Sequence, residues 1–356
     1  MIVRAYINRI ATAVPPNDIH EAFTTYAEGL IVDPKRRRLF RRMAERSQIR
    51  QRWSCLAPAP AGANSAIDTS GLYRPGAFPS TAERMQRFET TAPDLAMRAV
   101  DRLNLGDRCK QVTHLIVTCC TGFAAPGLDL QIAARLGLSR SVERTLIGFM
   151  GCYAALNALK LARHIVRSEP QAQVMVVALE LCTLHLQETD DIEQALTFLV
   201  FGDGAAAALI SAEPVGLALD SFHVEVARES DDQITWNIRD QGFDMFLSGQ
   251  VPSTVGRALK AGQDRILGGA APVEIDLWAV HPGGRTVLDA VEGAFALPPQ
   301  ALAASREVLS RFGNMSSATV LFVLKALLEG PTAGRRGCAM AFGPGLTAET
   351  MLFTGA

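Results

Sequence analysis

Short apolar runs that are typical of buried strands alternate along this chain with segments of helical periodicity. Residues 112–120 (VTHLIVTCC) form the clearest of these runs, and residues 173–179 form another. Between them, residues 153–166 repeat Ala and Leu with a period near 3.6, which predicts a helix. Because strands and helices alternate, we expect an α/β fold whose sheets are mainly buried.

The same pattern starts again in the second half of the chain. After Glu213 and a following proline, a strand is expected at residues 277–280 and a helix at residues 318–328. We therefore expect two units, residues 1–212 and residues 213–356, that meet near this restart.

The composition excludes several classes of protein. Apolar residues make up 48% of the 356 residues, so the chain can bury a sizeable core. Its 35 Lys and Arg balance 36 Asp and Glu, and we expect no nucleic acid as a partner. No apolar run approaches the roughly 18–20 residues of a membrane helix, so no integral membrane segment is expected. Arg4 and Arg9 interrupt the apolar start at residues 1–16, which predicts a strand and not a signal peptide.

The cysteine content indicates free thiols. The chain has seven cysteines, an odd number, and no CxxC pair. Neither a disulfide framework nor a zinc site is expected, and a cytoplasmic location fits best. No nicotinamide fingerprint or phosphate-binding loop is present, so we expect no cofactor and no metal.

One cysteine lies in a sequence pattern that is typical of a catalytic residue. In residues 148–155 (GFMGCYAA) a strand ends, two glycines allow a tight turn, and Cys152 begins a helix. Because a helix N-terminus favours negative charge, this position predicts a lowered thiol pKa. The alternative is a structural cysteine buried at an ordinary junction of strand and helix.

A histidine follows a strand end in a similar turn. His281 comes directly after the strand at residues 277–280 and precedes Pro-Gly-Gly. Ligands favour the carboxyl ends of strands in α/β sheets, which predicts that this side chain faces a cleft. A histidinium there would hold Cys152 as a thiolate, and the ring can donate a hydrogen bond to a thioester oxygen. Alternatively, it is a loop histidine without a partner.

An asparagine completes the set. Asn314, in GNMSS, precedes the helix expected at residues 318–328, and its amide donates hydrogen bonds without titrating. Read alone, it fits a helix-capping loop equally well. Together, Cys152, His281 and Asn314 are what a cysteine acyl-transfer enzyme needs: one residue carries the acyl group, and two donors stabilise the enolate of a decarboxylated malonyl thioester.

Over nearly its whole length the sequence resembles the chalcone synthase-like type III polyketide synthases. The matching stretches are TCCTGFAAPG (118–127), GFMGCYAA (148–155), LVFGDGAAAA (199–208), HPGG (281–284), GNMSS (313–317) and AFGPGLT (341–347). The resemblance implies a homodimer with the thiolase-like five-layer αβαβα fold, built from two similar halves. It also implies that Cys152 is loaded from an acyl-CoA and extended with malonyl-CoA, assisted by His281 and Asn314, with these CoA thioesters as the substrates.

The resemblance also implies a set of substrate-binding residues. Phe201 matches an aromatic gatekeeper, and Met245 falls where a second gatekeeping phenylalanine is expected. The other expected cavity residues are Cys120, Cys182, His185, Trp236, Gly283 and Ser316. Trp236 falls where plant members have a glycine, and GFMGCYAA, ELCTLH and TWNI look more like bacterial members that take fatty acyl starters and form alkylpyrones or alkylresorcinols. Large apolar residues such as Phe201, Met245 and Trp236 are also common in ordinary cores.

A basic stretch stands apart from the balanced charge of the rest of the chain. Residues 35–52 hold nine Lys or Arg and one acid, Glu45. On a helix, Arg42, Arg46 and Arg50 would share a face. The family binds CoA in this region, so we expect Arg46 and Arg50 to contact its phosphates. The alternatives are a solvated helix or a weak patch for anionic membranes or nucleic acid.

Two other functions fit the same three polar residues. One is a ketoacyl-ACP or hydroxymethylglutaryl-CoA-type synthase of the thiolase superfamily, which differs in its partner. The other is a non-catalytic acyl-CoA-binding protein on the same fold.

Overall fold

A computed structural model describes residues 3–60, 66–227 and 230–356; residues 1–2 of the expected opening strand lie outside them. The strands of its large sheet are β1 (Tyr6–Ala13), β4 (His114–Cys119), β5 (Glu143–Gly148), β6 (Val174–Leu181), β7 (Asp203–Ser211), β8 (Leu217–Val226), β11 (Leu277–Val280), β12 (Arg336–Gly343) and β13 (Thr347–Gly355). Two short pairs are β2 (Asn17–Asp18) with β3 (Trp53–Ser54), and β9 (Ile234–Arg239) with β10 (Gly242–Leu247). The α-helices are α1 (His20–Leu30), α2 (Pro34–Arg46), α3 (Thr81–Asp101), α4 (Leu128–Arg135), α5 (Ala154–Ser168), α6 (Ile192–Val200), α7 (Val251–Ile266), α8 (Arg285–Ala294), α9 (Ala303–Phe312) and α10 (Thr319–Leu328).

The large sheet has two wings, one from each half of the chain. Its strand order is β11-β12-β13-β8-β1-β7-β6-β4-β5. The wings join where β1 and β8 pair through only two residue pairs, Tyr6 with Ala218 and Ile7 with Leu217. Strands β4, β5 and β6 run parallel to one another, as do β11 and β12, whereas the remaining pairs are antiparallel.

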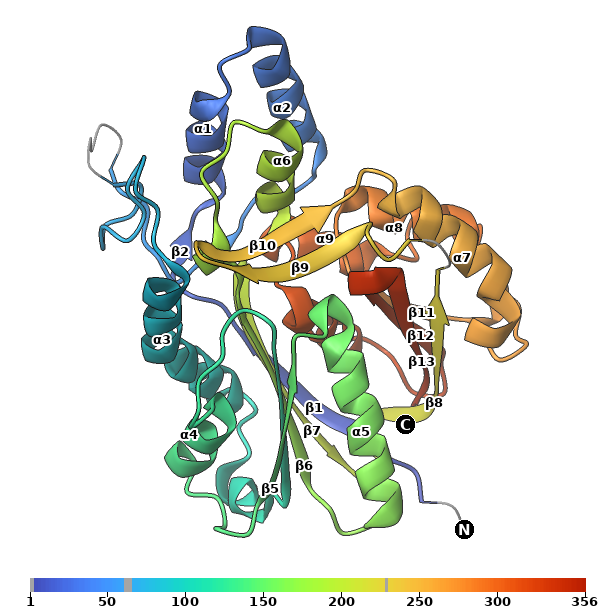
Figure 1. The fold of residues 1–356 in the computed structure, drawn as a ribbon. Coiled ribbons are helices and arrows are strands. Elements are labelled where there is room, and N and C mark those ends of the chain that lie inside the picture. The colour runs from blue at the N-terminus through green and yellow to red at the C-terminus, as the bar shows by residue number, and fades with distance from the viewer. Residues whose placement is uncertain (1–2, 61–65, 228–229) are drawn as a thin grey trace.

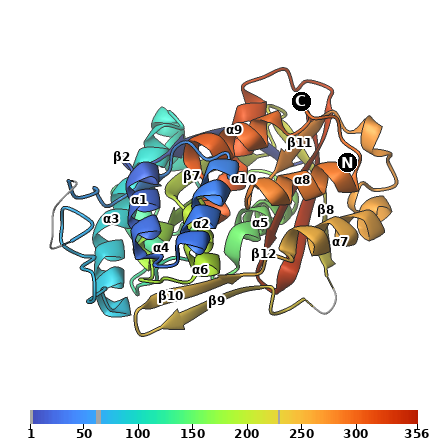
Figure 2. The ribbon, with the colours of Figure 1, turned by 90° about the horizontal axis from the view of Figure 1, so that it is seen from above.

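Helices cover both wings and fill the space between them (Figures 1 and 2). Helices α5 and α10 form the central layer, because α5 contacts β4, β6 and β13 while α10 contacts β1, β7, β11 and β12. Helices α3 and α4 cover the outer face of the N-terminal wing, and α7 and α8 cover that of the C-terminal wing. The result is the expected order of five layers, αβαβα.

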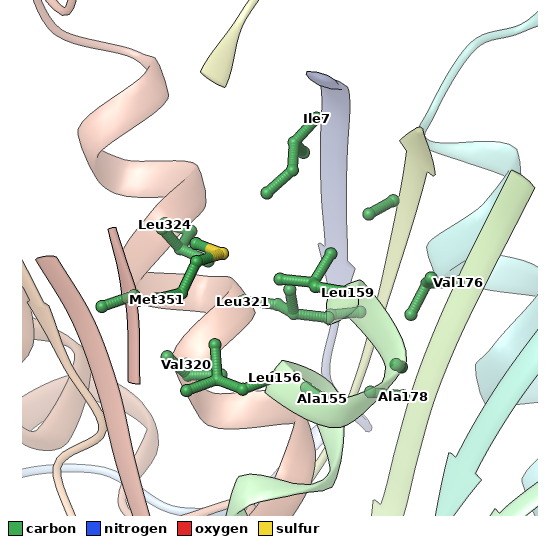
Figure 3. Close-up of a cluster of buried hydrophobic side chains, with 14 of the residues drawn as sticks. Ile7, Ala155, Leu156, Leu159, Val176, Ala178, Val320, Leu321, Leu324 and Met351 are labelled. Atoms are coloured by element: carbon green, nitrogen blue, oxygen red, sulfur yellow. The ribbon is translucent and has the colours of Figure 1, made fainter. Parts of the chain in front are cut away.

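The central layer owes its position to apolar burial. Figure 3 shows Leu159 of α5 and Leu321 of α10 in a buried cluster that reaches Val176 of β6 on one side and Met351 of β13 on the other. All four side chains are at most 1% exposed. Burying each such side chain stabilises the fold by about 1.5–3 kcal/mol, which fixes the helix that begins next to Cys152.

None of the helices in the described residues is long and apolar enough to cross a bilayer.

Candidate active site

A strained turn places Cys152 at the start of α5. Strand β5 ends at Gly148, and the chain reverses through Phe149 and Gly151, whose φ angles are 58° and 77°. A Cβ atom on Gly151 would lie 2.3 Å from Cδ of Pro344, so this turn requires glycine. Cys152 follows in a short 3-10 turn, and its side chain is buried, with 8% of the residue exposed.

His281 and Asn314 come from two different segments of the C-terminal wing. His281 follows the last residue of β11, and its backbone N–H donates to the carbonyl oxygen of Met340 at 2.8 Å. Asn314 lies in the loop after α9, where its N–H donates to the Val200 carbonyl at 2.7 Å and its own carbonyl accepts from Gly202 at 2.9 Å. These backbone bonds fix Asn314 beside the end of α6.

The fold brings Cys152, His281 and Asn314 to the wall of one cavity. Seven of the other expected residues line the same cavity: Cys120, Cys182, Phe201, Trp236, Met245, Gly283 and Ser316. Sequence reasoning missed several of its lining residues, which are Thr121, Phe198, Ile234, Leu247, Val251, Val287, Phe342 and Pro344. Most of these are apolar side chains on ordinary amphipathic elements, so no local signal distinguishes them from core residues.

The Cys152 thiol contacts Asn314 directly. The Cys152 thiol donates to Oδ1 of Asn314 at an Sγ–Oδ1 distance of 3.9 Å. The same oxygen accepts from the backbone N–H of Ser316 at 2.8 Å, which orients the amide. No described residue accepts a hydrogen bond from Nδ2 of Asn314, and both ring nitrogens of the buried His281 also lack a partner among the described residues. Unpaired buried polar groups of this kind are suited to a ligand that supplies the partner.

Burial acts against the charged forms that the sequence suggested. It raises the pKa of Cys152 to about 12, opposed in part by hydrogen bonds from Ser316 and Asn314. It also lowers the pKa of His281 to about 3. Both shifts run opposite to the histidinium and the lowered thiol pKa expected from the sequence, because desolvation favours the neutral form of each group.

A buried carboxylate ties the two halves of the site together. Glu180, on β6, accepts from the Cys120 N–H at 2.9 Å, from the Thr121 hydroxyl at 2.8 Å and from the Ser317 hydroxyl at 2.5 Å. Burial raises the pKa of Glu180 to about 7, although these hydrogen bonds oppose the shift. The carboxylate thus joins the end of β4 to the loop that carries Asn314.

The hairpin of β9 and β10 closes one side of the cavity, and its cross-strand partners Trp236 and Met245 both face inward. The indole Nε1 of Trp236 donates to the Cys120 carbonyl at 2.8 Å.

His185 was expected to line the cavity but lies behind its wall. Its Nε2 bonds the Thr121 carbonyl oxygen at 2.7 Å, its Nδ1 accepts from Phe243 N–H at 3.0 Å, and its ring stacks on Phe243. These contacts use both ring nitrogens, so His185 supports the wall.

The two arginines expected at the CoA phosphates lie on the surface outside the cavity. Helix α2 ends at Arg46, and Gln48 adopts a φ of 62° that turns the chain away. The prediction that Arg42, Arg46 and Arg50 share a helical face is therefore wrong for Arg50. Its guanidinium instead bonds Ser310 at 2.7 Å and lies 3.5 Å from Glu307, both on α9.

Comparisons with known proteins agree with this fold. The N-terminal domain of chalcone and stilbene synthases matches residues 4–214, and their C-terminal domain matches residues 219–356. A polyketide synthase-like protein of alpha-pyrone synthesis from Mycobacterium tuberculosis, Pks18, is 33% identical over 98% of this chain and 91% of its own length. Bisdemethoxycurcumin synthase of rice is 36% identical over 77% of this chain and 74% of its own length.

Solved structures show the same architecture. A polyketide synthase from the brown alga Ectocarpus siliculosus, PKS-I, superposes with a TM-score of 0.88 at 29% identity, covering 100% of this chain and 99% of that one. The C-terminal type III polyketide synthase domain of Steely1 from Dictyostelium superposes with a TM-score of 0.89 at 23% identity, covering 99% of both chains. The thiolase-like fold is thereby confirmed. The chain belongs to the chalcone and stilbene synthase family, and it is a type III polyketide synthase, an acyltransferase that condenses acyl-CoA with malonyl-CoA by decarboxylation.

Proposed function

We propose that this synthase loads a fatty acyl-CoA on Cys152, extends it with malonyl-CoA, and cyclises the chain to an alkylpyrone or an alkylresorcinol. The observation that carries the proposal is that Cys152, His281 and Asn314 share a cavity whose other walls are mainly aliphatic and aromatic. An alkyl chain gains about 0.8 kcal/mol for each CH₂ that such walls bury. The similarity to an alpha-pyrone synthesis protein agrees with a pyrone product.

Loading requires a proton transfer, because Cys152 is buried as a neutral thiol. In the proposed step, His281 accepts the proton from Sγ and the thiolate attacks the carbonyl carbon of the acyl-CoA. The bond from that carbon to the CoA sulfur then breaks, and CoA leaves with a proton. His281 is neutral before the step, as a general base must be.

Extension uses the two unpaired donors. Malonyl-CoA loses CO₂, and the electron pair of the broken bond forms an enolate whose oxygen accepts from Asn314 Nδ2 and from the His281 ring. The enolate carbon attacks the acyl carbon on Cys152, a carbon–carbon bond forms, and the Cys152 thiolate leaves. The lengthened chain, now on CoA, returns to Cys152 for the next cycle. Positioning and oxyanion stabilisation are the protein's share of this chemistry.

The CoA phosphates are proposed to lie near Arg46. Arg46 ends α2, is exposed, and makes no ion pair within the part of the chain that the structure describes. Arg50 is proposed as a second contact, reached by exchanging its exposed partner Glu307 for a phosphate. Exposed ion pairs of this kind contribute about 0–1 kcal/mol, so the exchange is inexpensive.

Replacing Trp236 tests the proposed substrate class. Trp236→Ala removes an indole from the cavity wall, so starters longer than the wild-type optimum should gain in kcat/KM by about fourfold for each extra CH₂ that is buried. Trp236→Phe, which fills most of the same space, is the matched control. Products from fatty acyl-CoAs of increasing length, from hexanoyl to stearoyl, are identified by mass spectrometry with malonyl-CoA and no carrier protein.

Two results would contradict the proposed starter. One is an unchanged length preference in Trp236→Ala, and the other is a preference of the wild type for aromatic over fatty acyl-CoA. Absence of any pyrone or resorcinol without a carrier protein would instead favour a ketoacyl-ACP type of synthase.

We also propose that the chain forms a homodimer through the edge of its large sheet. Strand β5 is the last strand on the N-terminal side, so one edge of its backbone has no partner strand in the described chain. Leu146 on β5 and Met150 just after it are 41% and 39% exposed. An uncovered strand edge with apolar side chains can pair with the same edge of a second copy. Such pairing would place the dimer interface beside Cys152.

Leu146→Lys should convert the dimer to a monomer, because it places a charge in the apolar part of that interface. Light scattering coupled to size-exclusion chromatography gives the mass. Val273→Lys, at a residue that is 89% exposed elsewhere on the surface, is the control and should leave the mass unchanged. A wild-type mass of one chain would refute the dimer.

A further inference from the structure

The helical hairpin of α1 and α2 stands out from the body of the molecule. Figure 1 shows the two helices side by side at the top, and in Figure 2 they lie nearest the viewer. Only the inner side of α2 is held in the fold, where Phe40 and Ala44 form a buried cluster with Phe198 and Leu199 of α6. The outer side of α2 is therefore a convex surface that no other described element covers.

The outer side of α2 is strongly cationic. Arg41 pairs with Glu28, and Nε of Arg37 donates to the Ile31 carbonyl at 2.9 Å. The remaining cations are exposed, and their side chains make no hydrogen bond or ion pair within residues 3–60, 66–227 and 230–356; they are Lys35, Arg36, Arg38, Arg42 and Arg46. The acids among them are Asp33, whose carboxylate caps the helix, and Glu45. The surface thus keeps a clear excess of positive charge in a chain whose formal charge is -1.

Apolar side chains lie among these cations. Val32, at the tip of the hairpin, is 80% exposed, and Leu39 and Met43 are 48% and 42% exposed. At 100° per residue, Leu39 and Met43 lie one turn apart on the same stripe of α2. Arg36 borders this stripe on one side and Arg42 on the other. We call this surface, made of Val32, Leu39, Met43 and the cations Lys35, Arg36, Arg38 and Arg42, the hairpin patch.

A CoA headgroup does not account for the hairpin patch. The twelve residues from Lys35 to Arg46 span about 16 Å of helix, and CoA is proposed to meet only the Arg46 end. The phosphates of CoA are charged, so they make no favourable contact with exposed Val, Leu and Met side chains. The same holds for the backbone of a nucleic acid, which offers phosphates and no apolar surface to this side of a helix.

We propose that the hairpin patch docks this enzyme on the surface of a lipid bilayer rich in anionic headgroups. The cations meet the headgroup phosphates, and Val32, Leu39 and Met43 enter the boundary between headgroups and acyl chains. Clusters of Lys and Arg beside exposed apolar residues bind such surfaces with a contribution from each cation and each buried apolar group. A flat bilayer can reach a convex protrusion without a matching groove. This proposal does not depend on the identity of the starter. A fatty acyl-CoA and an alkylated product would nevertheless both partition to the bilayer surface.

The experiment measures cosedimentation of the full chain with vesicles, one set of phosphatidylcholine alone and one of equal parts phosphatidylcholine and phosphatidylglycerol. The wild type should bind the anionic vesicles and not the neutral ones. A triple variant, Lys35→Gln, Arg36→Gln and Arg38→Gln, should bind them at least about tenfold more weakly. The matched control removes the same charge from exposed cations elsewhere, in Arg140→Gln, Arg167→Gln and Lys260→Gln, and should bind as the wild type does.

A second variant distinguishes binding to a bilayer from purely electrostatic binding to any polyanion. Val32→Ser with Leu39→Ser keeps every charge, so it should weaken binding to the anionic vesicles severalfold while leaving retention on a cation-exchange resin at low salt unchanged. Circular dichroism and polyketide formation from a short, soluble starter should be unaltered in all variants, so a loss of vesicle binding is not a loss of folding or of activity. Four outcomes would overturn the proposal: no binding by the wild type, equal binding to neutral vesicles, an equal loss in the charge control, or full binding by the double Ser variant.

Discussion

Replacing Cys152 with Ala is expected to abolish polyketide formation, with a loss of about 10³-fold or more in kcat. Cys152 is the cysteine that begins α5 and contacts Asn314 in the shared cavity, at an Sγ–Oδ1 distance of 3.9 Å. Without its sulfur, no covalent acyl group forms, and the enolate has no acyl carbon held in position for attack. Product formation from a fatty acyl-CoA and malonyl-CoA, followed by mass spectrometry, measures the loss.

Cys338→Ala is the matched control for that prediction. Cys338 is fully buried in β12 outside the cavity, so its replacement removes a thiol without touching the site. Its product formation should remain near that of the wild type. A Cys152→Ala enzyme that makes product at a tenth of the wild-type rate would show that the sulfur is not the acyl carrier.

Replacing Asn314 with Ala is expected to slow decarboxylation of malonyl-CoA by about 10²–10³-fold, the usual cost of removing one preorganised oxyanion donor. Acyl loading on Cys152 should persist, because that step uses His281. The side chain also has a structural task, since its Oδ1 accepts from the Ser316 N–H at 2.8 Å. The release of CO₂ from malonyl-CoA and the mass of the acylated protein measure the two steps separately.

Asn314→Asp separates the donor from the structural acceptor. Above the pKa of the introduced carboxyl, Asp keeps an oxygen for the Ser316 N–H but cannot donate, so Asn314→Asp should be as slow as Asn314→Ala in decarboxylation. Its melting temperature should fall below that of the wild type, because the carboxylate is buried. A CO₂ release rate near that of the wild type in Asn314→Asp would contradict the proposed role of Nδ2.

The sequence predicted the layers of this fold because burial leaves a periodic signal. The run at residues 112–120 contains β4, and the helical pattern at 153–166 became α5, with its first residue in a 3-10 turn. The strand at 277–280 was predicted with its observed bounds. The longest helix, α3, was not predicted, although Ser80 and Glu83 form a capping box that marks its start.

Site residues were predictable where the backbone needed glycine. Gly151 and Gly313 have positive φ angles and approach Pro344 and Val200, so they mark the turns that carry Cys152 and Asn314. Glu180 gave no such signal. It lies in a strand of otherwise apolar residues, and its importance depends on partners that are distant in sequence.

Charge states were the least predictable property of the site. A helix N-terminus argues for a lowered thiol pKa, but burial outweighs it at Cys152, and burial is known only once the cavity is built. The prediction that Arg50 lies on the same helical face as Arg42 and Arg46 also failed because of a feature that only the structure shows. The left-handed residue Gln48, which turns the chain away after α2, is not recognisable as a helix stop from its residue type.

The central claim is that Cys152 alone carries the growing chain, although two other thiols, Cys120 and Cys182, line the same cavity. The most direct test incubates the enzyme with a fatty acyl-CoA in the absence of malonyl-CoA and locates the resulting thioester by peptide mass spectrometry. We predict one acyl group, on Cys152. A thioester on Cys120 or Cys182, or no thioester on any cysteine, would contradict the account.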